Sequence, residues 1–405
     1  MRRRRAPSSS LLPATTGKAG IFIAAAVLVI LGVSPVRGQT PLTGIGLGYP
    51  VAPVDARAAA VGGVAAALPG GSLSSRNPAS LSGFERLTLG FTLSPEAVDV
   101  DVSGSAPAQS TGRSRFGVAR VVVPVGQWRV GAGFSPELDQ DWRVALEDTL
   151  DFGGESFPYR ERRVSDGGLS SANVSLSRSI GPVSVGVGAD RLTGSLERSF
   201  RRSFSPDTAA GGGGALSDVT ASGSWAYSGW RFHGGLGVTL GDVARLNVGG
   251  SLAGDLEAEP NGPTETRVYD YPASLSASAS VTAVDGLVVT GGGGWTGWSS
   301  VAGDMREARA EDIRWAGGGV ELSNVDIGPL TVPLRLGGRV RELPFARPGM
   351  DQVTERALTG GFSVLGSGGL ASIGVGVEVG TRGDVGDAGI AEDFRRFHFT
   401  LQIRQ

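Results

Sequence analysis

The sequence of 405 residues contains no cysteine and, beyond position 18, no lysine. The absence of cysteine excludes thiol nucleophiles, thiolate metal sites and disulfide bonds. Because Lys18 is the only lysine, the rest of the chain cannot supply a phosphate-loop lysine, a Schiff base or a serine–lysine dyad. Only two histidines occur, His233 and His398, and neither stands beside a convincing nucleophile in the sequence. These absences predict that the protein is not an enzyme and holds no metal or other cofactor.

Long apolar runs are also scarce, and the one near the N-terminus has the form of a secretory signal. Four arginines (residues 2–5) and Lys18 precede an uncharged run over residues 19–33, which is shorter than the ~20 residues needed to cross a bilayer. Val36 and Gly38 are small residues at the spacing of a cleavage site before Gln39. We therefore expect a signal peptide over residues 1–38, with a retained N-terminal anchor as the alternative.

A basic stripe is absent as well. Residues 1–38 carry six basic and no acidic groups, so cleavage would leave 405 − 38 = 367 residues and move the formal net charge from −2 to (37 − 6) − 39 = −8. A mildly acidic chain with scattered arginines gives no support for a nucleic-acid partner.

Glycine is abundant, at 66 of 405 residues, and it lies mostly within segments that alternate in polarity. A period of two is the pattern of a β-strand, and a closed barrel is the strand structure that satisfies every backbone group inside hydrocarbon. About fourteen such segments follow Arg86. The sequence therefore predicts an all-β fold, a transmembrane antiparallel β-barrel of about 14 strands, with a soluble β-sandwich as the alternative. Clear examples of the alternation are residues 183–190, 245–252, 274–282, 332–341 and 373–380.

The connections between these segments are of two kinds. Gly181-Pro182 and Asp285-Gly286 predict tight turns, and long polar segments predict outward loops. The final amphipathic strand, from Phe397 to Gln405, is expected to close the barrel against the first strand. The predicted loops are residues 94–114, 136–171, 193–217, 254–270 and 342–355.

Residues 39–82 do not alternate, and they carry a motif with family-level specificity. The stretch D-A-R-A-A-A-V-G-G-V-A-A-A-L begins at Asp55 and is followed by an Asn-Pro-Ala step. It resembles the N-terminal region of the long-chain fatty-acid transporter superfamily of outer-membrane barrels, which also includes the barrel subunit that shuttles cargo in type IX secretion. About thirty residues resemble the family closely, and the resemblance implies that this segment folds into the lumen as a hatch. The residues that carry it are Arg57, Gly62, Gly63, Asn77 and Pro78.

The width of the predicted barrel independently favours a plug. A fourteen-strand barrel leaves an aqueous hole unless something fills it. Small residues allow the backbone to pack closely against the inner wall, and the Asn77-Pro78 step ends any helix there. We therefore expect a signal peptide over residues 1–38, a hatch over residues 39–82 and an outer-membrane β-barrel over residues 83–405, with a soluble N-terminal cap as the alternative to the hatch.

The resemblance implies passive transport of hydrophobic, fatty-acid-like small molecules across a bacterial outer membrane. Outer-membrane lipid and the barrel assembly machinery would be further partners. Arg335, Arg339 and Arg341 fall on the predicted lumen face, where they can pair a ligand carboxylate or balance lumen acids such as Asp190 and Glu378. The alternative function is a non-transporting scaffold or shuttle barrel for secreted proteins. A continuous apolar path would favour transport, and a filled lumen with an ordered external docking surface would favour the scaffold.

Overall fold

The computed structural model describes residues 41–52, 54–74, 76–102, 109–152, 155–204, 217–304, 309–327, 330–347, 349–366 and 369–405. The predicted signal peptide lies outside these residues and stays a prediction. In the described part of the chain, no helix combines the length and the hydropathy needed to cross a membrane.

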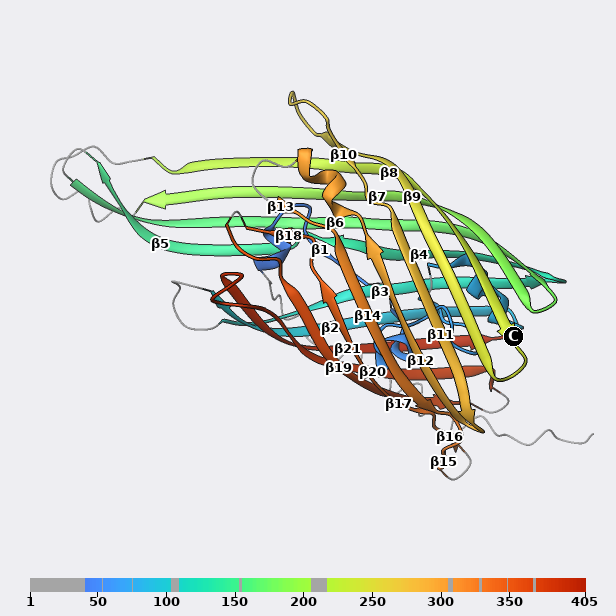
Figure 1. The fold of residues 1–405 in the computed structure, drawn as a ribbon. Coiled ribbons are helices and arrows are strands. Elements are labelled where there is room, and N and C mark those ends of the chain that lie inside the picture. The colour runs from blue at the N-terminus through green and yellow to red at the C-terminus, as the bar shows by residue number, and fades with distance from the viewer. Residues whose placement is uncertain are drawn as a thin grey trace, which may run out of the picture. The chain divides into compact units, whose positions relative to one another are not determined.

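Fourteen long antiparallel strands form a closed ring (Figure 1). Seventeen described strands share one sheet, and three of them, β1, β5 and β10, are additions to the ring. The last strand pairs with the first over a long register, from Thr88↔Arg404 to Val102↔Ile390, so the predicted closure and strand number are confirmed. The ring strands are β2 Thr88–Val102, β3 Gln109–Val125, β4 Trp128–Asp139, β6 Glu155–Ile180, β7 Val183–Phe204, β8 Val219–Leu240, β9 Ala244–Pro260, β11 Ser274–Val284, β12 Leu287–Thr296, β14 Ile313–Leu322, β17 Leu334–Glu342, β19 Thr354–Leu365, β20 Ala371–Asp384 and β21 Ile390–Arg404.

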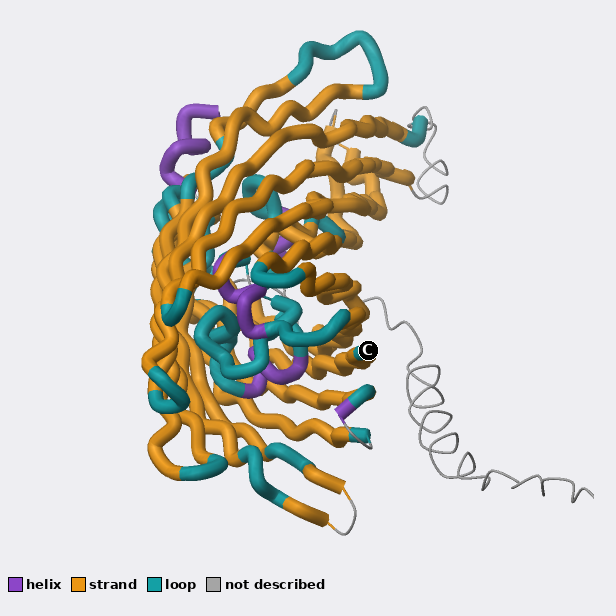
Figure 2. The backbone as a smooth tube through the Cα atoms, turned by 90° about the vertical axis from the view of Figure 1, so that its right-hand side faces the viewer, coloured by secondary structure: helices purple, strands orange, loops and turns teal. Residues whose placement is uncertain are grey.

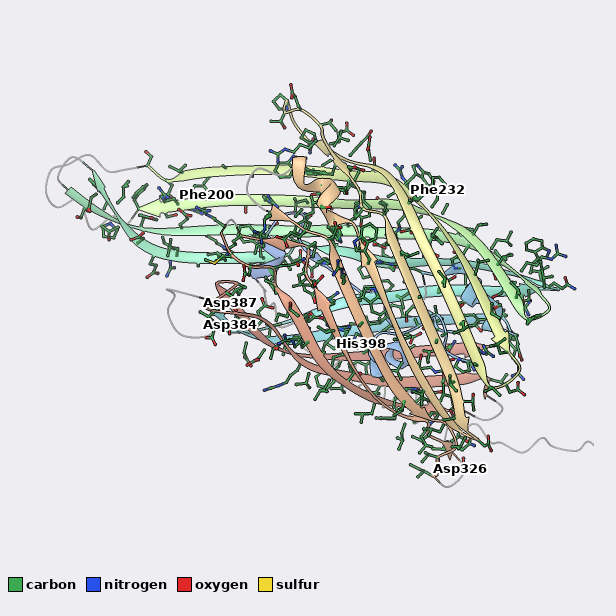
Figure 3. All side chains as sticks on the ribbon, in the orientation of Figure 1. Phe200, Phe232, Asp326, Asp384, Asp387 and His398 are labelled. Carbon is green, nitrogen blue, oxygen red and sulfur yellow. The ribbon has the colours of Figure 1, made fainter. Side chains whose placement is uncertain are left out.

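The alternating pattern places apolar side chains outside the ring and polar ones inside. On β17, Leu334 and Leu336 are 44% and 64% exposed, whereas Arg335 and Arg339 are 8% exposed. Phe232 likewise lies on the outer surface of the wall (Figure 3). Exposed apolar side chains recur on all the ring strands, which is the arrangement that a lipid-facing band requires.

One side of the ring extends well beyond the rest (Figure 1). Strand β6 has 26 residues, about 85 Å at ~3.3 Å per residue, whereas an apolar band is ~25 Å tall. Most of the predicted loop 136–171, and residues 193–204 of the predicted loop 193–217, are therefore strand, formed by β5 Trp142–Phe152 and by β6 and β7. The loop prediction was wrong there because a polar segment can continue a β-ladder in water. We call the parts of β5 to β8 beyond the apolar band the extension.

The other end of the ring carries tight turns. Gly126, Gly181, Gly241 and Gly286 have φ values of 60°, 60°, 58° and 81°, which favour glycine, so the turns predicted at Gly181 and Gly286 are confirmed. Short turns are typical of the periplasmic end of outer-membrane barrels, and longer connections of the external end.

The described residues of the predicted hatch lie inside the ring (Figure 2). They form 3-10 helix η1 Pro41–Gly44, strand β1 Tyr49–Pro50, helix α2 Ala56–Ala60 and 3-10 helix η2 Pro78–Gly83. Helix α2 packs on β17 and β19 to β21, and η2 packs on β4 and β6 to β9, so the segment spans the lumen from wall to wall. Asp55 caps α2 and Asn77 caps η2, each by accepting a backbone N–H. The remaining elements are β10 Arg267–Asp270, η4 Trp298–Asp304, the pair β13 Arg309–Ala310 and β18 Phe345–Ala346, and the hairpin β15 Asp326–Ile327 and β16 Leu330–Thr331.

An apolar cluster lies between the hatch and the extension. Its buried side chains come from β4, from β6 to β10, from β13, β14 and β18, and from η4. Leu47 of the hatch segment belongs to the same cluster, so the hatch and the outer part of the lumen share one core. Representative members are Leu192, Leu196, Tyr227, Leu256, Trp298 and Phe345.

Candidate functional site

Wall glycines form the surface on which the hatch rests. Gly62 has a φ of 76°, and a Cβ built on Gly337 would lie 2.8 Å from the Gly62 nitrogen. Asn77 lies against Gly235 and Gly249, where any wall side chain would collide with its carboxamide. These wall glycines, which belong to the abundant glycine of the chain, therefore let the hatch backbone approach the wall at van der Waals distance.

Arg57 fastens the hatch to the half of the wall that carries the tight turns. Its Nε and Nη2 donate to the two carboxylate oxygens of Glu321 at 2.7 Å each, and Nη1 donates to the Pro69 carbonyl at 2.6 Å. Burial lowers the pKa of Arg57, but the adjacent Glu321 carboxylate outweighs burial, so the pKa lies above its ordinary value. The contact with Pro69 also joins helix α2 to a later part of the hatch backbone.

The three predicted lumen arginines are all buried and all paired with wall carboxylates. Arg335 donates to Glu321 at 2.6 Å, Arg339 contacts Glu355 at 2.8 Å and Glu378 at 2.9 Å, and Arg341 contacts Glu355 at 2.9 Å. The structure therefore brings Arg339 and Arg341 to one cluster and places Arg335 beside Arg57. Glu355 belongs to the segment 342–355 that was predicted to be a loop, which is why its place in the cluster could not be foreseen.

Tyr49 is a hatch residue at the centre of this cluster that sequence reasoning missed. Its hydroxyl donates to Glu355 at 2.5 Å, and its ring lies 5.0 Å from the Arg341 guanidinium and 4.8 Å from that of Arg382. Arg396 also donates to the Tyr49 hydroxyl, at 3.3 Å. A lone tyrosine in a non-alternating segment carries no signal in the sequence that would have identified this role.

Strand β4 leaves its neighbour β3 partway along the wall. The β3–β4 ladder runs only from Val125↔Trp128 to Ala119↔Phe134, although β3 continues back to Gln109. Beyond a bulge at Pro136, β4 pairs instead with the hatch strand β1, through Tyr49↔Asp139 and Pro50↔Leu138. Among the described strands, none pairs with residues 109–118 of β3 on that side. We call this unpaired boundary the β3–β4 seam.

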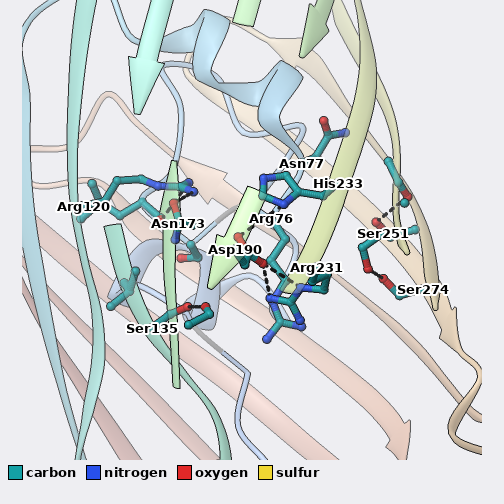
Figure 4. Close-up of a pocket in the computed structure, with 17 residues that line it drawn as sticks. Arg76, Asn77, Arg120, Ser135, Asn173, Asp190, Arg231, His233, Ser251 and Ser274 are labelled. Carbon is teal, nitrogen blue, oxygen red and sulfur yellow. Dashed lines mark hydrogen bonds and ion pairs between the residues drawn. The ribbon is translucent and has the colours of Figure 1, made fainter. Parts of the chain in front are cut away.

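Two adjoining cavities lie between the hatch and the wall. The larger, of about 250 Å³, is lined by apolar side chains such as Val54, Tyr271, Trp298, Ile313 and Trp315, with serines of β11 opposite the hatch. We call it the inner chamber. The smaller, of about 50 Å³, is lined by Val118 and Arg120 of β3 and Ser135 of β4, and it adjoins the seam (Figure 4). We call it the seam chamber. The two chambers share Ser74, Arg76, Asn77, Arg231, Ser251, Ser274 and Ser276.

Both histidines contact a serine and a carboxylate, contrary to the expectation from the sequence. His233 lies 3.1 Å from the Ser175 hydroxyl and 3.4 Å from Asp190, in the order of a catalytic triad. Ser175 is 1% exposed, however, and lines neither chamber, while Asp190 is also paired with Arg231 at 2.5 Å. The arrangement therefore gives a ligand no access to the hydroxyl and supplies no basis for proposing hydrolysis. Within the described ranges, no group of three His, Asp or Glu side chains is placed to hold a metal ion.

A closed fourteen-strand ring with a hatch in its lumen defines a plugged β-barrel of the outer-membrane type. Its fold is similar to that of the Pseudomonas putida toluene transporter TodX, at a TM-score of 0.58 and 16% identity over 90% of this chain and 99% of that one. It is also similar to the Ralstonia pickettii toluene transporter TbuX, at a TM-score of 0.53 and 17% identity over 90% and 99%. A Pseudomonas aeruginosa FadL homologue gives a TM-score of 0.54 and 14% identity over 87% and 98%.

No protein-family model and no curated protein sequence matches the chain. At these identities the likeness to solved structures establishes the fold. The resemblance to the fatty-acid transporter superfamily that the hatch motif predicted is therefore confirmed at the level of the fold.

Proposed function

We propose that the protein is an outer-membrane channel for the passive passage of small hydrophobic molecules. The observation that carries this proposal is the pair of adjoining chambers, which lead from an apolar cavity beside the hatch to the β3–β4 seam. The neighbours of the same fold are described as toluene transporters and a FadL homologue, which supports the proposal. An apolar ligand gains free energy on entering such a cavity and again on entering the lipid outside the seam.

The size of the inner chamber bears on the ligand. A cavity of ~150 Å³ suffices to bind benzene. The inner chamber, at about 250 Å³, therefore accepts a substituted single ring or a short alkyl chain. We propose ligands of this size, within the broader class of hydrophobic small molecules that the hatch motif implied.

The second candidate, a scaffold or shuttle barrel for secreted proteins, predicts a filled lumen. The chambers favour transport over that alternative, while the extension is the surface that a secreted partner would use.

The proposal is tested by uptake through an outer membrane that contains the processed chain. Cells that express it should take up labelled toluene several times faster than cells that do not, while the flux of a disaccharide stays at background because the hatch occupies the lumen. Equal rates of toluene uptake in the two strains would contradict the proposal.

Gentle extraction from native membranes separates the two candidates. Mass spectrometry should find small hydrophobic molecules bound to the protein above the level of an unrelated barrel. Recovery of a stoichiometric secreted protein without such molecules would favour the scaffold.

A further inference from the structure

The passage between the two chambers is bounded by charged side chains that are held in place. Arg76 of the hatch and Arg231 of β8 line both chambers, and Glu137 of β4 lines the inner one. Arg231 donates to the Glu137 carboxylate at 2.8 and 3.0 Å, and Arg76 donates to it at 2.9 Å. Glu137 therefore links the hatch to β8 at the boundary between the two chambers.

The two arginines that line both chambers are balanced by carboxylates, and a third, Arg120, lines the seam chamber alone. The two guanidinium groups of Arg76 and Arg231 face the two carboxylates of Glu137 and Asp190. The other two arginines of the inner chamber, Arg339 and Arg341, are paired with Glu355 in the same way. Each arginine that lines the inner chamber is therefore already paired with a wall carboxylate, and an anion at the constriction would meet Glu137 at close range.

A backbone irregularity places Glu137 there. Pro136 has no N–H, and the ladder between β4 and β6 shifts register between Pro136 and Leu138. Glu137 and Ser135 on either side of the proline are both buried, and Ser171 of β6 donates to Glu137 at 3.0 Å. A bulge that aims a side chain into a site is a common device of β-sheet proteins.

We propose that Glu137 determines the specificity of the channel by excluding anions, so that its ligands are uncharged hydrophobic molecules. This inference rests on the proposed function. The proposal replaces the expectation that the lumen arginines pair with a ligand carboxylate. The positive charge of these arginines is already neutralised by carboxylates of the wall. Arg76 contributes to the same balance from the opposite side, and its side chain is 49% exposed.

The test compares benzyl alcohol with benzoate, which share one ring and differ in charge at neutral pH. Binding to the processed full chain is followed by tryptophan fluorescence, because three tryptophans, Trp295, Trp298 and Trp315, line the inner chamber. The native protein should bind benzyl alcohol about tenfold more tightly than benzoate or better. The isosteric change Glu137→Gln should bring the ratio of the two dissociation constants to about one or below, because it leaves Arg76 and Arg231 with Asp190 alone.

Two further variants make the result interpretable. Arg76→Gln removes a positive charge from the same constriction and should raise the preference for the alcohol. Because Arg76 is half-exposed, the fold should tolerate this change, so it provides the test if Glu137→Gln fails to fold. Glu161→Gln is the matched control, since Glu161 is paired with Arg163 and Arg202 on the extension, away from both chambers. It should leave the ratio unchanged.

The outcomes separate the two ideas. Equal binding of the two probes by the native protein, or a ratio that neither Glu137→Gln nor Arg76→Gln alters, overturns the role of Glu137 and leaves the channel proposal standing. A native protein that binds neither probe overturns the channel proposal itself, and the inference with it.

Discussion

Arg57 connects the hatch to the wall through hydrogen bonds in a planar fork, which lysine cannot reproduce. Replacing it by alanine should lower the free energy of unfolding by about 1.5–3 kcal/mol, the value of a hydrogen bond to a charged group. The loss stays in this range because Glu321 keeps Arg335 as a partner. The change is read from the denaturant midpoint of the purified barrel, together with the rate at which protease cleaves the hatch.

Arg160→Ala is the control for Arg57→Ala. Arg160 forms its ion pair with Glu147 on the extension, where both side chains are 70% exposed, so its loss should leave the midpoint unchanged. A midpoint that falls equally for both variants would mean that Arg57 does not anchor the hatch.

Two adjacent glycines of β8 test the close approach of the hatch to the wall. Gly235 faces Asn77, and an added methyl group would displace the carboxamide that caps η2, whereas a Cβ on Gly234 finds its nearest neighbour at 3.9 Å. Gly235→Ala should destabilise the folded barrel by about 1–3 kcal/mol, and Gly234→Ala should be neutral or slightly stabilising. The temperature at which the folded band disappears in an unheated gel measures both, and equal temperatures would refute the packing argument.

At the residue scale, the sequence predicts which side chains enter the lumen and does not predict their partners. The alternation on one strand places Arg335, Arg339 and Arg341 on the inner face. Their partners Glu321, Glu355 and Glu378 lie on other strands. Such pairing depends on register between strands, which a local pattern does not contain. Glu137 was missed for a further reason, since it falls in the segment 136–171 that was predicted to be a loop, whereas β4 continues to Asp139.

Among the elements, the seam between β3 and β4 is the feature on which the proposed route depends. The chain has no native cysteine, so a pair introduced at Val118 and Ser135, which line the seam chamber together, can form only with each other. Closing the seam with this Val118→Cys, Ser135→Cys disulfide should reduce toluene uptake severalfold, and a reducing agent should restore it. Uptake that is unaffected in the oxidised protein would exclude the seam as the route.

The elements themselves were only partly predictable. In the apolar band, apolar and polar residues alternate along each strand, and this alternation predicted the strands there. On the extension the outward residues are polar too, as at Arg160 and Arg162, so the pattern that marks a half-buried strand is lost and the segment resembles a loop. Hydrogen bonds of the β6–β7 ladder maintain the strands there. This ladder runs without interruption from Ile180↔Val183 to Tyr159↔Phe204.

Taken as a whole, the molecule divides into a ring in lipid and an extension in water, and matched substitutions distinguish the two environments. Leu336 is 64% exposed on the apolar band and Leu146 is 47% exposed on the extension. Arginine in place of Leu336 should cost about 2–4 kcal/mol, the value for a charge at the lipid face near mid-membrane, while Leu146→Arg should change the free energy of unfolding by less than ~0.5 kcal/mol. The comparison requires folding into lipid vesicles with a denaturant titration. Equal costs at the two positions would mean that the outer surface around Leu336 faces water, and a purified chain that stayed monodisperse without detergent would lead to the same conclusion.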